Sequence, residues 1–561
     1  MLLEHLDYDI LLHILSFLEA SDLCRLQRTS RRLHYVAGDP WLWRRLALPI
    51  ADMSPVPPDA GFAVSRKYAA TLASTPLVPA SLSAQLLTGE TYPPPLADDD
   101  EMITDADRTP DRANPAGQLE PISMDNQATA QYKLALWFHA QCKAAYLAGT
   151  PTIAPLIHQD IVAAMDIDDW LLATCCRDGA VSVWDLNKCQ KTLWETTNTQ
   201  QVTVAVQCCL RLNMLVVGVV GEIIVISLRD GRHLQRIEAH PGSLLRTLVL
   251  SARSLFSGGE DYRVNTLTLN PNYAPQPLVY GEPFEPAPST PALPETENLL
   301  PFLPQHRTII LHENVSTFMQ LSYPFLYAAS RDSTIVVYHV IHQVIVTKLQ
   351  EHHDSITNFS ITPTHLVSGS RDKQMFLWTR PSDEMLDAKV SAELHRRRGF
   401  TAGMDPLFTA TQCGFEVKFR FEIPVWVSAV LATRETMCMG RIFSSEVQVR
   451  SILPPYAELT TLQLPITQVV RRITGTTYSS LVVCGDPAMC LVLLFAPIGH
   501  NCSMQRFSDP GWSLQQCVET GIRERFPASL LRRAGDIRWL LDRVLPRSCA
   551  STLVTSRDVD V

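Results

Sequence analysis

The chain has 561 residues, a formal net charge of −9 and a sequence pI near 6.0. This length leaves room for two or three folding units, and the acidic balance argues against a general nucleic-acid-binding protein. The fourteen cysteines are scattered without a CxxC pair, so their spacing favours neither a zinc site nor a secreted disulfide framework. We expect them to be small hydrophobic residues in a reducing compartment, which predicts a cytoplasmic or nuclear protein.

Two hydrophobic stretches need to be separated from targeting and membrane segments. The first nine residues carry acidic side chains where a secretion signal has basic ones. The most apolar later run, residues 479–499, is interrupted by Asp486-Pro487. That break favours a β-hairpin over a membrane span.

Residues 6–46 are expected to form a compact unit of four short helices. Apolar residues recur at helical spacing from Ile10 to Leu18, and capping residues precede the later helices at Asp22, Ser30 and Asp39. So few residues cannot bury a self-sufficient core. The exposed leucines and tryptophans therefore predict either a partner that covers them or docking on the rest of the chain.

This helical segment resembles the F-box over nearly the whole motif, although Asp7 stands where the family usually has proline. The resemblance implies that residues 1–48 bind the adaptor of an SCF (cullin–RING) ubiquitin ligase, and through it a cullin and a RING subunit. It also implies which side chains face the adaptor: Leu6, Ile10, Leu11, Ile14, Leu18, Leu23, Trp41 and Trp43.

Residues 49–129 differ in composition, with eleven prolines between residues 51 and 129 and an acidic run at 98–101. We interpret them as a disordered linker, with an acidic docking segment for a basic partner as the alternative. Residues 130–148 regain helical spacing and predict a linker helix. We expect this helix to pack under the domain that follows and to set how the F-box is presented.

A long-period repeat begins near residue 150. Each copy contains two short strands joined by a tight turn, as in residues 366–378. A histidine precedes the turn aspartate by 20 or 21 residues, and an aromatic residue or leucine follows it by six. The four copies are His158/Asp178/Trp184, His240/Asp261/Leu267, His312/Asp332/Tyr338 and His352/Asp372/Trp378.

These copies resemble WD40 repeats, which implies a mainly β fold with a β-propeller over residues 150–499. Weaker repeats at 202–228, 426–452 and 466–497 bring the predicted count to seven blades. A strand at 152–157 is expected to complete the last blade, because ring closure removes exposed sheet edges. Two insertions, at 271–305 with ten prolines and at 381–415, are expected to be loops, and residues 500–561 a helical tail best formed at Leu530 to Val544.

The resemblance further implies a hydrogen-bond relay that pins each blade. It joins the histidine, the turn aspartate, the tryptophan and a Ser/Thr that corresponds to Thr174, Ser257 or Ser368. Ala328 replaces this Ser/Thr and Leu267 replaces the tryptophan, so the relay is expected to be incomplete in at least two blades. We interpret the histidines as structural, and not as metal ligands or catalytic bases.

Candidate substrate-binding residues are four arginines. Arg177, Arg331 and Arg371 directly precede turn aspartates, and Arg246 lies early in the strand after His240. In phosphate-reading F-box/WD40 receptors, arginines at these positions line the channel face, where a planar guanidinium binds phosphate with two hydrogen bonds. The alternative is a surface arginine with a weak ion pair.

The sequence contains no Gly-rich phosphate loop, HExxH motif or nucleophile elbow, so we predict no catalytic residue, cofactor or metal. The favoured function is the non-catalytic substrate-recognition subunit of an SCF ubiquitin ligase, whose protein target is phosphorylated or not. The alternative is a WD40 scaffold in another assembly that only holds the adaptor. An enzyme that uses the propeller channel is a third class and would need acid/base residues that the sequence does not cluster.

Overall fold

The computed structural model describes residues 124–168, 171–186, 190–196, 205–251, 253–273, 300–396, 405–433, 435–465, 470–475, 480–485, 488–496 and 514–537, with 203, 275, 278, 540 and scattered positions from 15 to 43. Contacts divide the chain into two compact units. One unit comprises Met1–His139 and Phe526–Ile537, and the other comprises Ala140–Arg525 and Arg538–Val561. Each unit has its own hydrophobic core.

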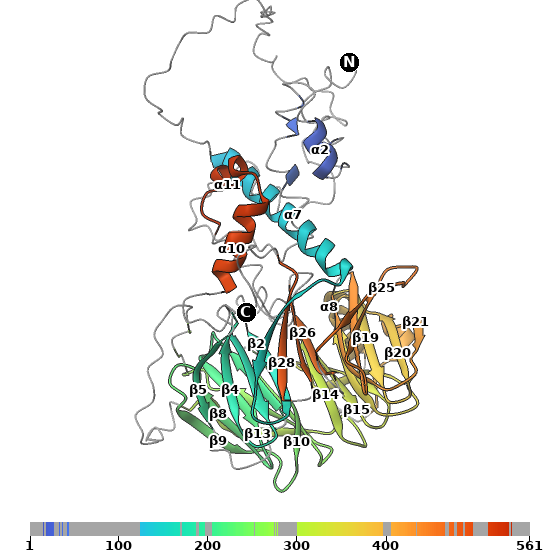
Figure 1. Cartoon of the computed structure of the whole chain (residues 1–561). Coiled ribbons are helices and arrows are strands. Elements are labelled where there is room, and N and C mark those ends of the chain that lie inside the picture. The colour runs from blue at the N-terminus through green and yellow to red at the C-terminus, as the bar shows by residue number, and fades with distance from the viewer. Residues whose placement is uncertain are drawn as a thin grey trace, which may run out of the picture. The chain divides into compact units, whose positions relative to one another are not determined.

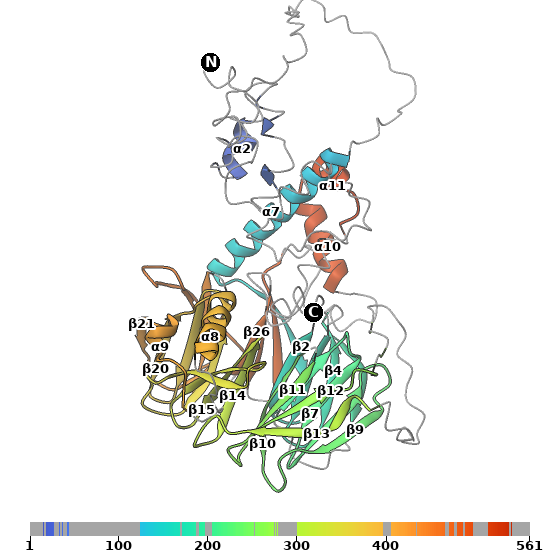
Figure 2. The ribbon, with the colours of Figure 1, turned by 180° about the vertical axis from the view of Figure 1, so that it is seen from behind.

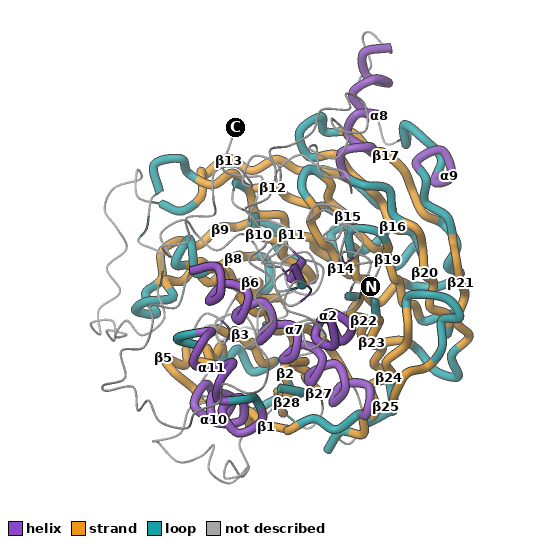
Figure 3. Tube along the Cα trace, turned by 90° about the horizontal axis from the view of Figure 1, so that it is seen from above, coloured by secondary structure: helices purple, strands orange, loops and turns teal. Residues whose placement is uncertain are grey.

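The larger unit is a β-propeller. Within the described residues, seven four-stranded antiparallel sheets form a ring of blades (Figures 1 and 3). In blade order, the strands are β2 (Val162–Asp168), β3 (Leu171–Cys176), β4 (Val181–Asp185) and β5 (Gln190–Thr196); β6 (Ala205–Cys209), β7 (Met214–Gly218), β8 (Glu222–Ser227) and β9 (His233–Glu238); β10 (Leu245–Leu250), β11 (Ser254–Gly259), β12 (Val264–Leu269) and β13 (Phe302–Ile309); β14 (Ser316–Ser322), β15 (Phe325–Ser330), β16 (Ile335–His339) and β17 (Val344–Leu349); β18 (Ile356–Ile361), β19 (His365–Ser370), β20 (Gln374–Thr379) and β21 (Val417–Glu422); β22 (Val427–Ala432), β23 (Thr436–Arg441), β24 (Glu446–Ser451) and β25 (Glu458–Gln463); and β26 (Val470–Gly475), β27 (Ser480–Gly485), β28 (Met489–Leu494) and β1 (Thr152–Ile157).

This topology confirms the predicted mainly β fold and the seven blades. Strand β1 pairs antiparallel with β28, from Thr152 opposite Leu494 to Ile157 opposite Met489, and so closes the ring. The apolar run predicted to be a hairpin is the β27–β28 pair. Among the helices in the described part of the chain, none is long and apolar enough to cross a bilayer.

Burial follows the position of each strand in its blade. The second strands β3 and β15 are buried at all six positions, because neighbouring blades cover both faces, and their sequences are correspondingly apolar. The outermost strands β13 and β21 are mostly exposed. The core therefore consists of apolar layers between successive blades.

Innermost strands of successive blades are also joined by side chains that accept backbone hydrogen bonds. Asp166 of β2 accepts from Cys208 N at 2.8 Å, Gln320 of β14 from Ile361 N at 3.1 Å, and Ser360 of β18 from Ala432 N at 2.9 Å. These bonds satisfy amides that face the ring axis, where no neighbouring strand is available.

The structure corrects both predicted loop insertions. The end of the 271–305 insertion is the start of β13. The exposed Pro304 is tolerated there because β13 is the outer strand of blade 3. The 381–415 insertion, which connects β20 and β21 of blade 5, forms two helices, α8 (Asp383–Arg396) and α9 (Ala410–Cys413), that lie beside blade 4 (Figures 2 and 3). Leu386 and Val390, one helical turn apart, bury α8 in the core shared by blades 4 and 5.

Arg380 anchors the start of α8. Its buried guanidinium donates to Tyr327 Oη at 3.0 Å, to Thr362 O at 3.1 Å and to Ser322 Oγ at 2.8 Å, and it pairs with Asp383. A buried charge with this many partners fixes one orientation of the insertion.

Helix α7 (Met124–Ala148) begins six residues before the predicted boundary at 130, so the last residues assigned to the linker are helical. Its last turns pack on the propeller as expected, with Tyr146 Oη 2.9 Å from Cys438 Sγ and Lys143 Nζ 2.8 Å from Glu435. The rest of the predicted linker, from 49 to 123, lies outside the described residues.

The structure interrupts the predicted 530–544 helix near Gly535, Leu540 is again helical, and residues 541–544 lie outside the described part of the chain. The tail forms α10 (Leu514–Arg525) and α11 (Ala528–Ala534), and Gly535 with φ +74° follows the end of α11 inside the predicted 530–544 helix. In the smaller unit, Phe526 stacks on Trp137 of α7 at 6.4 Å between ring centroids, and Gln131 donates to Ala534 O at 3.1 Å. In this unit the tail therefore packs on α7.

Candidate binding surfaces

Blade 5 contains the complete relay. His352 Nδ1 lies 2.8 Å from Asp372 Oδ2, and its Nε2 lies 2.8 Å from Ser368 Oγ, which also accepts from Trp378 Nε1 at 3.0 Å. Because a carboxylate only accepts, the ring proton is on Nδ1, and Nε2 accepts from the serine hydroxyl. Burial raises the pKa of Asp372, but the hydrogen bonds from His352 and from the His353 and Gln374 amides together outweigh this effect and hold the pKa below its usual value. Every polar group of the relay therefore has a partner.

Blades 1, 3 and 4 repeat parts of the relay, which is incomplete in blades 3 and 4, as predicted. His158 and Trp184 both bond Thr174 Oγ1, at 2.9 and 3.0 Å, in blade 1. In blade 4, His312 Nδ1 lies 3.1 Å from Thr334 Oγ1, but its buried Nε2 has no partner among the described residues, because Ala328 stands where the hydroxyl should be. These hydrogen bonds assign the relay histidines a structural role.

The three arginines before turn aspartates occupy one equivalent position in their blades. The backbone N–H of Arg177, Arg331 and Arg371 donates to the carbonyl of the residue before the first strand, at 3.1, 3.0 and 3.0 Å. All three side chains are exposed at the same end of the ring. The structure therefore brings the predicted arginines to one rim of the propeller, which we call the turn face.

Sequence reasoning missed the acidic residue at the same position of blade 3. Glu260 N donates to Leu244 O at 2.9 Å, as the arginine amides do in their blades. Its carboxylate accepts from Arg246 Nε at 2.9 Å and lies 3.9 Å from Arg331. Two of the four predicted guanidiniums thus share a carboxylate, whereas Arg177 and Arg371 form no ion pair within the described part of the chain. Aligning the turn aspartates would have revealed Glu260, because it precedes Asp261 directly.

The structure places the described F-box residues differently from the prediction. Leu23 and Trp43 are fully buried, and Trp43 Nε1 donates to Ala37 O at 2.8 Å. They pack with Leu136 of α7 in the core of the smaller unit, so α7 supplies apolar surface that the short helices lack. Leu18 is partly buried, and the remaining predicted adaptor residues lie outside the described residues: Leu6, Ile10, Leu11, Ile14 and Trp41.

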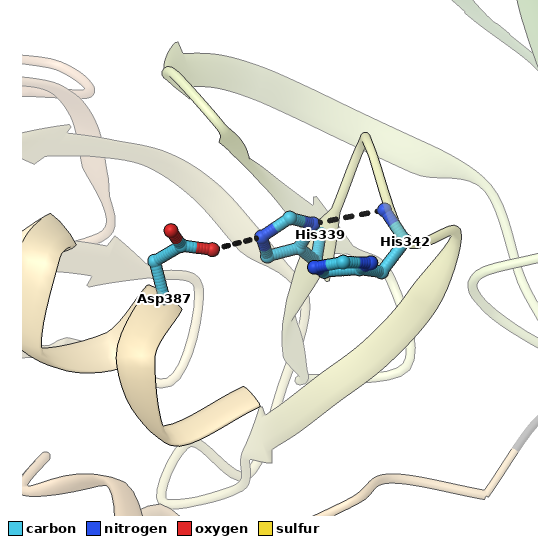
Figure 4. Close-up of side chains that lie close together, drawn as sticks. All are labelled: His339, His342 and Asp387. Carbon is cyan, nitrogen blue, oxygen red and sulfur yellow. Dashed lines mark hydrogen bonds and ion pairs between the residues drawn. The ribbon is translucent and has the colours of Figure 1, made fainter. Parts of the chain in front are cut away.

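A histidine–aspartate cluster joins α8 to blade 4 (Figure 4). His339 is buried at the end of β16, and its Nε2 lies 2.8 Å from Asp387 Oδ1 on α8. The backbone N–H of His342 donates to His339 Nδ1 at 3.1 Å, and the two rings lie 4.5 Å apart. One ligand atom from each residue falls within 4.8 Å of the others, so the cluster has to be tested as a metal site.

The hydrogen bonds of this cluster argue against a metal ion. An amide N–H can only donate, so His339 Nδ1 must accept, and the single proton of the neutral ring is on Nε2, facing Asp387. A metal at Nε2 would require Nδ1 to carry the proton and donate it, as in metal-bound histidines. Burial lowers the pKa of His339, although the bond to Asp387 opposes the shift. The arrangement fits a neutral histidine that ties α8 to the blade.

The described cysteines behave as the sequence analysis expected. Ten are free thiols, and nine of these are buried. Burial raises the pKa of Cys175 and of Cys438 to about 12, so these thiols stay protonated and are poor nucleophiles.

Comparison with known families adds two matches. A family model described as F-box-like matches residues 4–49, and the WD domain, G-beta repeat matches residues 343–379. The second match covers β17 to β20, so the sequence repeat is offset from the blade by one strand, the same offset that lets β1 close the ring. No curated protein matches the chain.

The fold and these two matches define a class, in which an F-box is joined to a WD40 β-propeller. The chain is an F-box/WD40-repeat protein. Both families typically act as non-catalytic adaptors or receptors, and an F-box suggests an adaptor as its partner.

Proposed function

We propose that this protein is the substrate-recognition subunit of an SCF-type ubiquitin ligase. The observation that carries the proposal is the combination of an F-box-like segment at residues 4–49 with a closed propeller in one chain. The F-box binds the adaptor, and the propeller holds a protein target near the ubiquitin-loaded enzyme, which raises the local concentration of target lysines. The chain itself catalyses nothing, and it works in the cytoplasm or nucleus.

The turn face is the proposed target-binding surface. Thr152, which follows α7, and Ile157 are at opposite ends of β1, and Ile157 pairs near the β27–β28 turn, the equivalent of the arginine turns. Five steps of about 3.3 Å along the strand separate these ends by roughly 17 Å. Arg177, Arg331 and Arg371 therefore lie at the opposite end of the blades from the point where α7 enters the ring, and a target there does not compete with α7 for surface.

The ligase assignment is tested by affinity purification of the tagged full chain from cells. Adaptor, cullin and RING subunit should be recovered together, and Leu11→Glu in the predicted adaptor surface should remove all three. Leu453→Asn, an exposed residue of the propeller, is the matched control and should change nothing. Recovery of the adaptor without cullin would support the scaffold alternative, and binding unaffected by Leu11→Glu would refute the F-box role.

The phosphate hypothesis is tested on proteins that accumulate when Leu11→Glu disables the F-box. Changing Arg177, Arg331 and Arg371 together to glutamate should abolish their capture if phosphate groups bind the turn face. Phosphatase treatment of the captured proteins should then have the same effect. Capture that survives both treatments would show that the turn face recognises something other than phosphate.

A further inference from the structure

One sector of the turn face exposes large aromatic side chains. Trp426 precedes the first strand of blade 6 and is 39% exposed, and Phe443, in the turn between β23 and β24, is 80% exposed. The two positions are adjacent, because Ile442 N donates to Trp426 O at 3.1 Å. The guanidinium of Arg371, on the neighbouring blade, lies 5.2 Å from the centre of the Trp426 ring. We call Arg371, Trp426 and Phe443 the aromatic rim.

Phe443 is unfavourable for the isolated protein in two respects. Its side chain is largely in water, and its backbone is left-handed with φ +56°. Bulky residues rarely adopt this conformation. An aromatic residue that is both strained and exposed is a sign of a functional contact.

The charge of the aromatic rim differs from that of blades 3 and 4. There Glu260 pairs with Arg246 and lies near Arg331, whereas no described carboxylate is within ion-pair distance of Arg371. Asp372, the next residue, accepts a hydrogen bond from His352. One available guanidinium over the Trp426 ring, with Phe443 on the adjoining turn, suits a single carboxylate next to an apolar side chain. A phosphate dianion would need several converging donors.

We propose that the aromatic rim binds an unphosphorylated segment of a partner protein in which a large apolar residue is next to Asp or Glu. The apolar side chain packs on Trp426 and Phe443, and the carboxylate accepts hydrogen bonds from Arg371. This inference rests on the proposed function in taking the turn face as the target-binding surface. It differs from the phosphate hypothesis because the groups bound are an apolar side chain and a carboxylate, not a phosphate.

The test uses the purified full chain and synthetic eight-residue peptides on a Ser/Gly background. The fourth position is varied over all amino acids, and the fifth is Asp, Asn or phosphoserine. We expect binding by peptides with Phe, Trp, Leu or Met followed by Asp, and at least tenfold weaker binding by the Asn series. A preference for phosphoserine that ignores the fourth position would overturn the proposal, as would binding by no peptide.

Variants assign the contacts with the best Phe–Asp peptide. Phe443→Asn, which suits the left-handed backbone, should weaken binding at least tenfold, and Arg371→Gln should make the Asp and Asn peptides bind equally. Leu453→Asn removes an exposed apolar residue at the other end of blade 6 and should have no effect. Equal losses of peptide affinity in all three variants, or no loss in Phe443→Asn, would refute the aromatic rim as the binding site. Purification with cullin and RING is measured separately, so failure here leaves the ligase assignment standing.

Discussion

The relay of blade 5 allows a stability effect to be worked out from single hydrogen bonds. Ser368 is completely buried, and its hydroxyl serves His352 Nε2 at 2.8 Å and Trp378 Nε1 at 3.0 Å. Ser368→Ala leaves one buried acceptor and one buried donor without partners. Each such group costs about 1–3 kcal/mol, so we expect the variant to lose about 2–6 kcal/mol of unfolding free energy.

The chain offers a matched control for this change. Ser316 is also buried, but its hydroxyl has no partner among the described residues, so Ser316→Ala should cost nothing or stabilise slightly. The reciprocal variant Ala328→Ser would place a hydroxyl near the unpartnered Nε2 of His312 and should gain about 1 kcal/mol.

Urea unfolding of the wild type and the three variants measures these differences, provided that the slope with denaturant stays constant. If Ser368→Ala and Ser316→Ala shift the midpoint equally, the hydrogen bonds contribute nothing beyond the loss of one oxygen. The relay would then not stabilise blade 5 through the hydrogen bonds of Ser368.

Three further predictions use other parts of the chain. Glu260→Gln should release Arg246 and Arg331 from their carboxylate partner. The affinity of the turn face for a phosphoserine peptide, and the salt dependence of that binding, should both increase. Unchanged binding would mean that the ion pair does not limit this affinity. Burial lowers the pKa of His339, so as the pH falls below about 6.5 the unfolded state binds a proton at this histidine before the folded state does. The free energy of unfolding should therefore decline by up to about 1.4 kcal/mol per pH unit. Thermal melts from about pH 7.5 to 5.5 should show a flatter slope for His339→Gln. Deletion of residues 55–120 should leave the melting temperature nearly unchanged, because a proline-rich acidic segment offers little apolar surface; a large decrease would disprove the linker interpretation.

The sequence predicted the ring well because its signals are local. Alternating apolar residues, tight turns and the His-to-Asp spacing each reflect contacts within one blade, and even blades 6 and 7, which lack the His and Trp marks, appear where their strand patterns were. The insertion at 381–415 was mistaken for a loop, although Leu386 and Val390 have the spacing of a buried helical face. The prolines of 271–305 likewise obscured an exposed outer strand.

The binding surfaces were harder to predict, for a physical reason. Apolar spacing shows that Leu23 and Trp43 are buried by something, but it does not say whether a partner or the chain's own α7 covers them. The arginine turns revealed a rim, but not that Glu260 of blade 3 would pair with Arg246 and lie near Arg331 of blade 4. The contact with α7 joins segments far apart in the chain, which no local pattern encodes. Glu260, in contrast, could have been found from the sequence, because it directly precedes the turn aspartate Asp261.

The propeller separates the residues that hold a turn from those that can vary. Asp372 is fixed by His352, and the residue before it is fixed only through its backbone amide, which bonds Ser355 O. The same amide bond forms whether the side chain is Arg331, Arg371 or Glu260, so the fold places no demand on that side chain. Charge can therefore change from blade to blade at this position at little cost in stability. The turn face is accordingly the part of the ring where target specificity can evolve independently of folding.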